Sequence, residues 1–226
     1  MTTIKLCISW VLPRFAALFA ASKPLSTFFA QKLTMFFPCV IVYIMNTKPS
    51  LSTRDLCYIG IFSTIISVCS QIAIPLPGGV PLTLQTWAIA LAGLVLGPKN
   101  GTMAVIVYIL LGAAGAPVFA NMTSGLGVFL LPSGGFVLAF PFVALLAGLG
   151  ERKGGMFWML SGLLSGMVLT WIIGMFYFSW ITKLDLWVSF TVAVIPFILT
   201  DLIKIATLPY ASKGIKAALV RGGVAL

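Results

Sequence analysis

Long apolar runs, separated by short stretches rich in Gly, Pro and charge, dominate the chain from about residue 50 onward. A helix needs about 20 apolar residues to cross a bilayer, and fewer where it is short or the membrane is thin. The uncharged runs therefore predict six membrane helices, at about residues 56–74, 84–97, 102–116, 135–150, 156–181 and 186–209. Because helices satisfy their own backbone hydrogen bonds in lipid, we expect an all-α integral membrane protein.

Basic residues gather at alternate ends of these predicted helices. From residue 48 onward, a six-helix arrangement puts one group on the same side: Lys48, Arg54, Lys99, Arg152, Lys153, Lys213, Lys216 and Arg221. The opposite side receives Lys183, partly offset by Asp185. Cytoplasmic loops carry the excess of Lys and Arg. Both termini are therefore predicted to be cytoplasmic.

Residues 1–47 fit this pattern less well. Their apolar stretch is broken by Lys23, Pro24 and Lys32, and neither a compact signal-peptide core nor a clear cleavage site follows. One interpretation is a seventh helix that is marginal or lies on the membrane surface. The other, which we favour, is a start of translation at Met45, because one extra span would put the N-terminus outside. The six-helix membrane domain is predicted to cover residues 48–226.

Two predicted outer loops contain no charged residue: PLPGGVPLTLQ, residues 75–85, and PVFANMTSGLGVFLLPSGG, residues 117–135. Irregular backbone at membrane depth is tolerated only where it is buried in protein or lines a cavity. The shorter loop fits a tight hydrophobic connector as well as it fits a segment that is buried in protein or lines a cavity. The longer one predicts a re-entrant plug or lid.

Composition narrows the class of protein. The chain is 60% hydrophobic and 8% charged, with a mean hydropathy of +1.13, which excludes an ordinary soluble surface. The net charge of +10 is scattered at the ends of apolar runs and indicates topology rather than nucleic-acid binding. There is no His, and the four Cys residues show neither metal-ligand spacing nor a disulfide pattern. We expect no metal and no cofactor.

One polar stripe interrupts the last predicted helix, in FILTDLIKIATLP, residues 197–209. Asp201 and Lys204 share a helix face with Thr200 and Thr207. A single charge at the centre of a span costs about 3 kcal/mol in insertion experiments, so the pair is a candidate functional site. The alternatives are an ion pair that only fixes helix packing, and a Lys204 side chain that reaches the cytoplasmic surface.

Further polar and aromatic groups lie near the predicted outer loops. Gln85 and Asn121 are amides, and Trp87, Tyr108 and Phe119 offer apolar walls. With the Asp–Lys pair they suggest a small, partly apolar ligand with a carboxylate at one end and hydrogen-bonding groups at the other.

Two other patterns concern partners. GLVLGPKNG, residues 93–101, lacks the spacing and the Ser or Thr of a phosphate-binding loop, so any ATPase is a separate subunit. Small residues recur on the first predicted helix, at Gly60, Ser63, Thr64 and Ser67. Such spacing lets another helix approach closely, either from the same chain or from a partner protein.

Three separated segments resemble the BioY-type biotin transporters, the substrate-binding (S) components of energy-coupling factor (ECF) transporters. They are PLPGGVPLTLQTWAIALAGLVLGPKNG, LLGAAGAPVFANMTSGLGVFLLPSGGF and TDLIK, in the same order as in that family. The similarity covers about residues 52–209. It implies a multi-pass protein of the cell (inner or plasma) membrane that binds biotin near its outer face. It also implies a transmembrane coupling subunit and ATPase subunits as partners.

The resemblance assigns ligand contacts to Asp201, Lys204 and Asn121, and less directly to Thr83, Gln85 and Trp87; Tyr108 is a candidate wall. Biotin has two ureido N–H donors and a carbonyl, an apolar ring and tail, and a carboxylate. Asp201 can accept from the N–H groups and Asn121 can donate or accept. Lys204 either balances Asp201 or meets the ligand carboxylate. Gly60, Ser63, Thr64 and Ser67 are the candidate contacts with the coupling subunit, although the family's alanines are replaced there.

High-affinity biotin uptake is therefore the expected function. A different class is an ion- or proton-coupled secondary carrier of a small carboxylate, with Asp201 as the proton site. An intramembrane enzyme would need a second acid, or a nucleophile with a base. Asp201 is the only acid well within a predicted span, so we expect no enzymatic activity.

Overall fold

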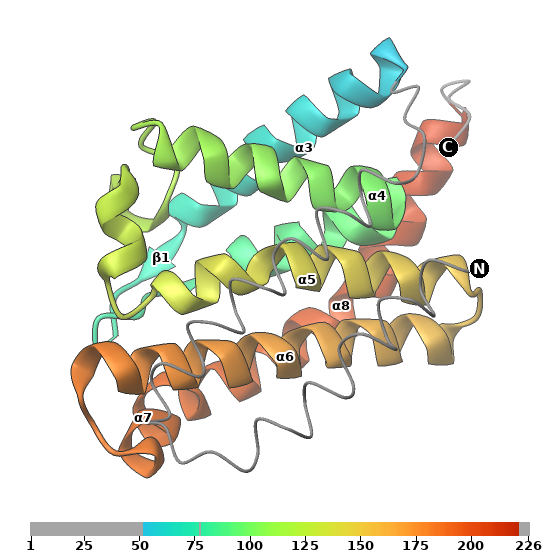
Figure 1. Cartoon of the computed structure of the whole chain (residues 1–226). Helices are drawn as coiled ribbons and strands as arrows, with labels where there is room; N and C mark the ends of the chain where they lie inside the picture. Colours follow the sequence, from blue (N-terminus) through green and yellow to red (C-terminus); the bar gives the residue numbers. More distant parts are fainter. Residues whose placement is uncertain (1–51, 77, 222–226) are drawn as a thin grey trace, which may run out of the picture. The chain divides into compact units, whose positions relative to one another are not determined.

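The computed structural model describes residues 52–76 and 78–221, so the predictions for residues 1–47 lie outside the described part. The elements follow in the order α3 (Thr53–Gln71), β1 (Ala73–Ile74), β2 (Leu82–Thr83), α4 (Gln85–Ala113), η1 (Ala120–Met122), η2 (Leu126–Leu130), α5 (Gly134–Arg152), α6 (Met156–Thr182), α7 (Leu186–Ala193) and α8 (Ile195–Arg221) (Figure 1). The two strands form a short antiparallel hairpin that pairs Ala73 with Thr83. The described fold is otherwise helical, which confirms the all-α class.

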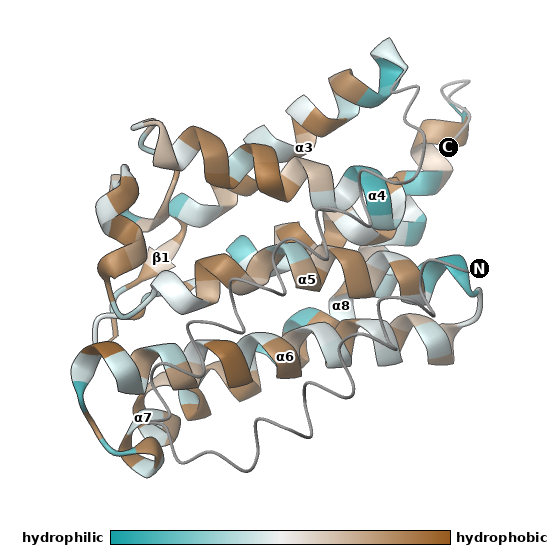
Figure 2. Cartoon of the chain, in the orientation of Figure 1, coloured by the Kyte–Doolittle hydropathy of each residue, from teal (hydrophilic) through white to brown (hydrophobic). Residues whose placement is uncertain are grey.

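Within the described residues, four helices are long and apolar enough to cross a membrane: α4, α5, α6 and α8. Figure 2 shows hydrophobic residues along most of the length of the helices and hydrophilic patches near several helix ends. Such a distribution fits helices whose middles contact lipid or one another. The structure thus supports a multi-pass membrane protein.

The helix α4 contains a break that separates two helical segments. Gly97 has φ 79° and ψ 176°, a conformation that is essentially restricted to glycine. A Cβ atom at Gly101 would lie 2.7 Å from the Cα of Gly93, so the chain folds back on itself at this point. The residues predicted as the second and third membrane helices lie on either side of the break.

The last predicted helix, residues 186–209, begins where α7 begins but differs from the structure in its middle and at its end. It is divided into α7 and α8 at Val194, and α8 continues past Pro209 to Arg221. Pro196 lies in the first turn of α8, where the missing N–H costs no helical hydrogen bond, so a new helix begins there readily. The basic residues that suggested an earlier end, Lys213 and Lys216, lie on the helix itself.

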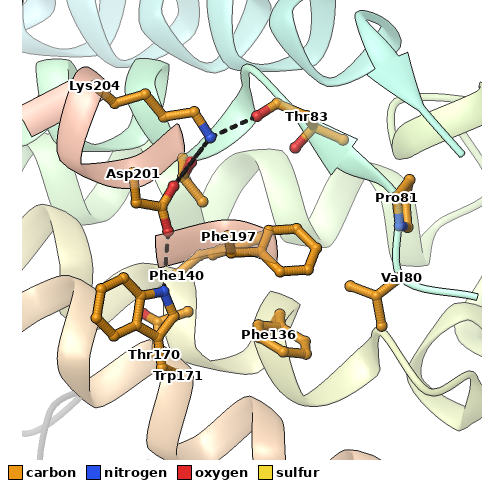
Figure 3. A pocket seen from close by; sticks show the side chains of 11 residues that line it. Val80, Pro81, Thr83, Phe136, Phe140, Thr170, Trp171, Phe197, Asp201 and Lys204 are labelled. Carbon is orange, nitrogen blue, oxygen red and sulfur yellow. Dashed lines mark hydrogen bonds and ion pairs between the residues drawn. The ribbon is translucent and has the colours of Figure 1, made fainter. Parts of the chain in front are cut away.

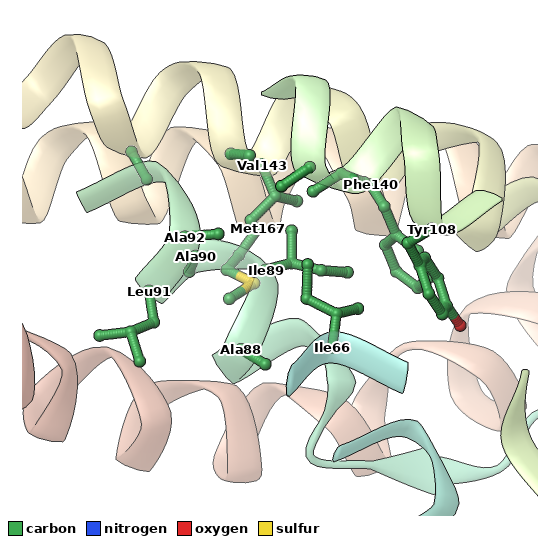
Figure 4. Packing of buried hydrophobic residues seen from close by; sticks show 14 of the residues in the cluster. Ile66, Ala88, Ile89, Ala90, Leu91, Ala92, Tyr108, Phe140, Val143 and Met167 are labelled. Carbon is green, nitrogen blue, oxygen red and sulfur yellow. The ribbon is translucent and has the colours of Figure 1, made fainter. Parts of the chain in front are cut away.

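The core lies where α4, α5 and α6 pack side by side around small residues. Ala88, Ala90, Ala92, Ala144 and Ala147 are each 0% exposed. Larger side chains such as Ile89, Val143 and Met167 fill the space between the helices (Figure 4). Close packing of small residues is the usual way for helices to associate in a membrane. The resulting scaffold holds one face of α8 against the start of α4.

The N-terminal end of α3 is fixed by a capping box. The backbone N–H of Ser52 donates to Oδ2 of Asp55 at 3.1 Å, and the hydroxyl of Ser52 accepts from the helix in return. Asn100 also donates to Oδ1 of Asp55, at 3.0 Å. Because Asn100 lies just after the α4 break, this carboxylate connects α3 to the turn inside α4.

Candidate functional site

A pocket lies where α4, α5, α6 and α8 meet the loop that joins β1 to β2. Its lining is Val80, Pro81, Thr83, Thr86, Phe136, Phe140, Thr170, Trp171, Phe197, Asp201 and Lys204 (Figure 3). The space between these side chains, including its open mouth, is about 390 Å³.

Lys204 is the centre of the polar end of the pocket. Its Nζ donates to the carbonyl oxygen of Thr83 at 2.8 Å and to the hydroxyl of Thr86 at 2.9 Å. A third bond of 3.0 Å goes to Oδ1 of Asp201. An ammonium group has three donors, so these acceptors use its full capacity. Lys204 therefore points into the protein and connects α8 to β2 and to the start of α4.

Asp201 is 3% exposed and has partners on both carboxylate oxygens. The indole Nε1 of Trp171 donates to Oδ2 at 2.9 Å. Lys204 donates to Oδ1, and the hydroxyl of Thr86 lies 3.5 Å from the same oxygen. A buried carboxylate without such partners is very costly, and this set of donors offsets the cost. The site thus holds a fixed, desolvated acceptor group.

The remaining walls are apolar and mostly aromatic. Phe136 and Phe197 stack with ring centroids 6.1 Å apart and an angle of 30° between the rings. Phe140, from α5, and Val80, from the loop between the strands, complete this end (Figure 3). The pocket therefore combines a polar end on α8 with an apolar end formed by aromatic rings.

The structure brings together only part of the predicted substrate site, namely Thr83, Asp201 and Lys204. Gln85 is buried and donates to the hydroxyl of Tyr108 at 2.8 Å, away from the pocket lining. Trp87 donates to the hydroxyl of Thr207 at 3.1 Å. Asn121 is exposed in η1 and does not line the pocket.

Several lining residues were not predicted from the sequence. Thr86 follows directly on the predicted loop motif, and Trp171 lies in the middle of the predicted fifth helix. Trp is enriched at membrane interfaces, so an indole at mid-span was a usable signal for a buried acceptor. Phe136, Phe140 and Phe197 carried no such signal, because Phe is common throughout the apolar segments.

The small residues of α3 do not share one surface. Gly60 and Thr64 are exposed, and a Cβ at Gly60 would meet nothing within 4 Å. Ser63 is 2% exposed, and its hydroxyl has no hydrogen-bond partner among the described residues. Ser67 is half-buried and donates to the carbonyl oxygen of Ser63. Gly60 and Thr64 are thus the members of this set that are open to a partner.

Two known proteins are similar to this chain over about two thirds of its length. The "Probable biotin transporter BioY" of Pyrococcus horikoshii is 37% identical over 158 residues, which cover 70% of this chain and 93% of that protein. The "Biotin transporter BioY" of Thermotoga maritima is 40% identical over 153 residues, 67% of this chain and 89% of that protein.

A solved structure is also similar. The crystal structure of the S-component for biotin from an ECF-type ABC transporter superposes with a TM-score of 0.65 and 30% identity, over 72% of this chain and 91% of that chain. The sequence model of the BioY family matches residues 45–221, most of the chain. The protein therefore belongs to the BioY family.

Proposed function

We propose that this chain is the substrate-binding component of a biotin uptake system in the cell membrane. The observation that carries the proposal is the buried Asp201–Lys204 pair at the polar end of an aromatic pocket, in a member of the BioY family. Relatives from two organisms are named biotin transporters, and a similar solved structure is described as the S-component for biotin. The family argues against the enzyme alternative.

The chemistry of the pocket matches the chemistry of biotin. Asp201 is the acceptor for the ureido N–H groups, and Trp171 and Lys204 hold its carboxylate in place for them. Phe136 and Phe197 pack against the apolar ring and tail. Because Lys204 already serves three acceptors in the chain, its role is to balance Asp201 rather than to meet the ligand carboxylate.

Asn121, Gln85, Trp87 and Tyr108 remain proposed contributors to the site. Asn121 is the strongest of them, because its side chain has no hydrogen bond within the described structure and is exposed. Gln85 and Tyr108 bind each other, so their contribution is to the wall behind the pocket. No cofactor is proposed, since biotin is the transported ligand.

The proposed topology has six membrane helices with both termini in the cytoplasm and re-entrant-like outer loops, in a domain of residues 48–226. The two segments of α4, together with α3, α5, α6 and α8, supply the helices. The distribution of Lys and Arg supports the orientation. The loop between β1 and β2 and the segment 117–133 are then the outer loops.

The proposed partners are a transmembrane coupling subunit and ATPase subunits. Residues 93–101, the segment with a superficial likeness to a phosphate-binding loop, contain the break in α4 at Gly97 and lack the spacing and the Ser or Thr of such a loop. Gly60 and Thr64 supply the exposed small surface on α3 for the coupling subunit. Energy for transport then comes from outside this chain.

The test is equilibrium binding of labelled biotin to the purified, detergent-solubilised chain without partners. We expect saturable binding that unlabelled biotin competes. Asp201→Asn should weaken it by about 1–3 kcal/mol, the value of a hydrogen bond to a charged group. Asp185→Asn, which changes a carboxylate at the start of α7, is the matched control and should leave binding unchanged. A folded, monodisperse sample that binds no biotin would contradict the proposal.

The secondary-carrier alternative makes a different prediction. With Asp201 as a proton site, uptake by cells would collapse when an uncoupler is added at constant ATP. Under the proposal, uptake depends on ATP and survives the uncoupler.

A further inference from the structure

The loop that carries Asn121 has an unusual backbone. Asn121 and Met122 both lie in the left-handed region, with φ 57° and 58°. Asn tolerates this conformation, but an unbranched side chain such as Met loses about 1–2 kcal/mol there. Two consecutive residues of this kind persist only where surrounding contacts hold them.

Gln71, the last residue of α3, bonds to the backbone on both sides of Asn121. Its Oε1 accepts from the N–H of Met122 at 3.0 Å, and its Nε2 donates to the carbonyl oxygen of Phe119 at 3.1 Å. The carbonyl oxygen of Pro117 lies 3.4 Å from the same nitrogen. One amide therefore spans the turn and fixes the path of the chain through Asn121.

Other contacts fix the base of the loop and close the turn from Phe119 to Thr123, without bonding to the two left-handed residues themselves. Phe119 is 2% exposed and packs edge-on against Tyr108, with ring centroids 5.5 Å apart. Ser70 donates to the carbonyl oxygen of Val118. Thr123 closes the turn locally on the carbonyl oxygen of Ala120. Among the described contacts, the Gln71 side chain is the one that bonds to the backbone of Met122.

Gln71 also directly precedes the β1–β2 hairpin, part of which lines the pocket. β1 begins two residues after Gln71, and Ala73 pairs with Thr83. The carbonyl oxygen of Thr83 accepts from Lys204 in the pocket. Gln71 is thus the junction between the hairpin that lines the pocket and the loop that presents Asn121, and its own side chain is not part of the pocket lining.

We infer that Gln71 is a positioning residue for ligand binding: it holds the backbone at Asn121 in the left-handed conformation and so fixes where the exposed amide of Asn121 is presented, without contacting biotin itself. The inference rests on the proposed function and on the role proposed there for Asn121. Losing the Gln71 bonds releases the loop into conformations that do not bind, and the apparent affinity falls with the fraction that still does.

The first experiment compares binding of labelled biotin to the purified full chain and to Gln71→Met, which keeps the length of the side chain but removes its amide. We expect an apparent Kd about tenfold higher for the variant. Glycine adopts the left-handed region at no steric cost, so adding Met122→Gly should restore binding to within about threefold of the Met122→Gly single variant. A purely structural role for Gln71, or a direct contact with biotin, predicts no such rescue.

A double-mutant cycle with Asn121→Ala tests the route of the effect. If Gln71 acts through Asn121, Gln71→Met should change binding little once Asn121 is already Ala. Full additivity of the two losses, or wild-type affinity in Gln71→Met, would overturn the inference. If Gln71→Met does not fold, Met122→Val, which disfavours the left-handed region, replaces it and should weaken binding while Met122→Gly does not. Absence of saturable binding to the unmodified chain would instead overturn the proposed function, and the inference with it.

Discussion

The indole Nε1 of Trp171 lies 2.9 Å from Oδ2 of Asp201, so α6 and α8 are joined through a carboxylate that is 3% exposed. This bond orients the acceptor group of the pocket from the side opposite Lys204. Trp171, in the middle of α6, therefore has a hydrogen-bonding role in addition to packing. Its nitrogen helps to fix which way the carboxylate faces.

Trp171→Phe removes the donor but keeps an aromatic ring. Oδ2 of Asp201 would then be left without its partner in an apolar pocket, at a cost of about 1–3 kcal/mol. We expect a lower thermal unfolding temperature in detergent and weaker biotin binding. Trp187→Phe is the matched control, because Trp187 is 72% exposed on α7. Equal effects of the two substitutions would contradict the role of Trp171.

Lys204→Met leaves Asp201 without its countercharge. Breaking a buried ion pair by removing one partner costs about 3–5 kcal/mol, because the other charge stays buried. The double variant Asp201→Asn, Lys204→Met should recover part of that stability, since no charge is then left unpaired. Thermal unfolding of the four proteins in the same detergent measures the coupling. Biotin binding should remain weak in the double variant, and strictly additive stability losses would show that the pair is not coupled.

Gly97→Ala tests the break in α4. The conformation at φ 79° and ψ 176° is open to glycine and strained for other residues, at a cost of about 1–3 kcal/mol. A Cβ at Gly97 would meet nothing within 4 Å, so the loss reports backbone strain and not a clash. Gly214→Ala in α8 is the control, because its Cβ also meets open space within a regular helix. That change should stabilise by up to about 1 kcal/mol. Similar unfolding temperatures for both variants would argue against a special backbone at Gly97.

The ion pair between Lys216 and Glu151 joins the end of α8 to the end of α5 at 2.6 Å. Both side chains are 29% exposed, so solvent and salt weaken the pair and its value is about 0–1 kcal/mol. Lys216→Met should therefore lower the unfolding temperature only slightly, and less so at high salt. A large loss that does not depend on salt would mean that Lys216 stabilises the protein in another way. The exchange of the two charges, Glu151→Lys with Lys216→Glu, should restore the small loss.

The parts of the site that could be predicted from the sequence are the charged residues within an otherwise apolar helix. Asp201 and Lys204 stand out because charge is rare in an apolar helix and their spacing puts them on one face. Phe136, Phe140 and Phe197 could not be singled out, since aromatic residues occur throughout the chain and only the tertiary structure brings these three to the same pocket. The role of Trp171 needed the tertiary structure for the same reason.

In the fold, too, some features could be predicted from the sequence and others could not. A short connection near residues 97–101 follows from the predicted helices 84–97 and 102–116, because the uncharged runs stop and restart there. The separation of α7 from α8 at Val194 was missed because the surrounding segment carries no charge. Pro196 was a usable signal, since it would disrupt the interior of a helix over residues 186–209 but fits the first turn of a new helix. The path of the loop through Asn121 depends on a side chain fifty residues away in sequence, which no local pattern reveals.

The acceptor that Lys204 uses on β2 is the carbonyl oxygen of Thr83, not its hydroxyl. Every amino acid supplies that oxygen, so a replacement at position 83 alters the shape and polarity of the pocket wall without deleting the bond. The hairpin can thus change what it presents to a ligand while its attachment to α8 is retained. Position 83 is therefore a place where ligand preference can be redesigned independently of how the hairpin is held.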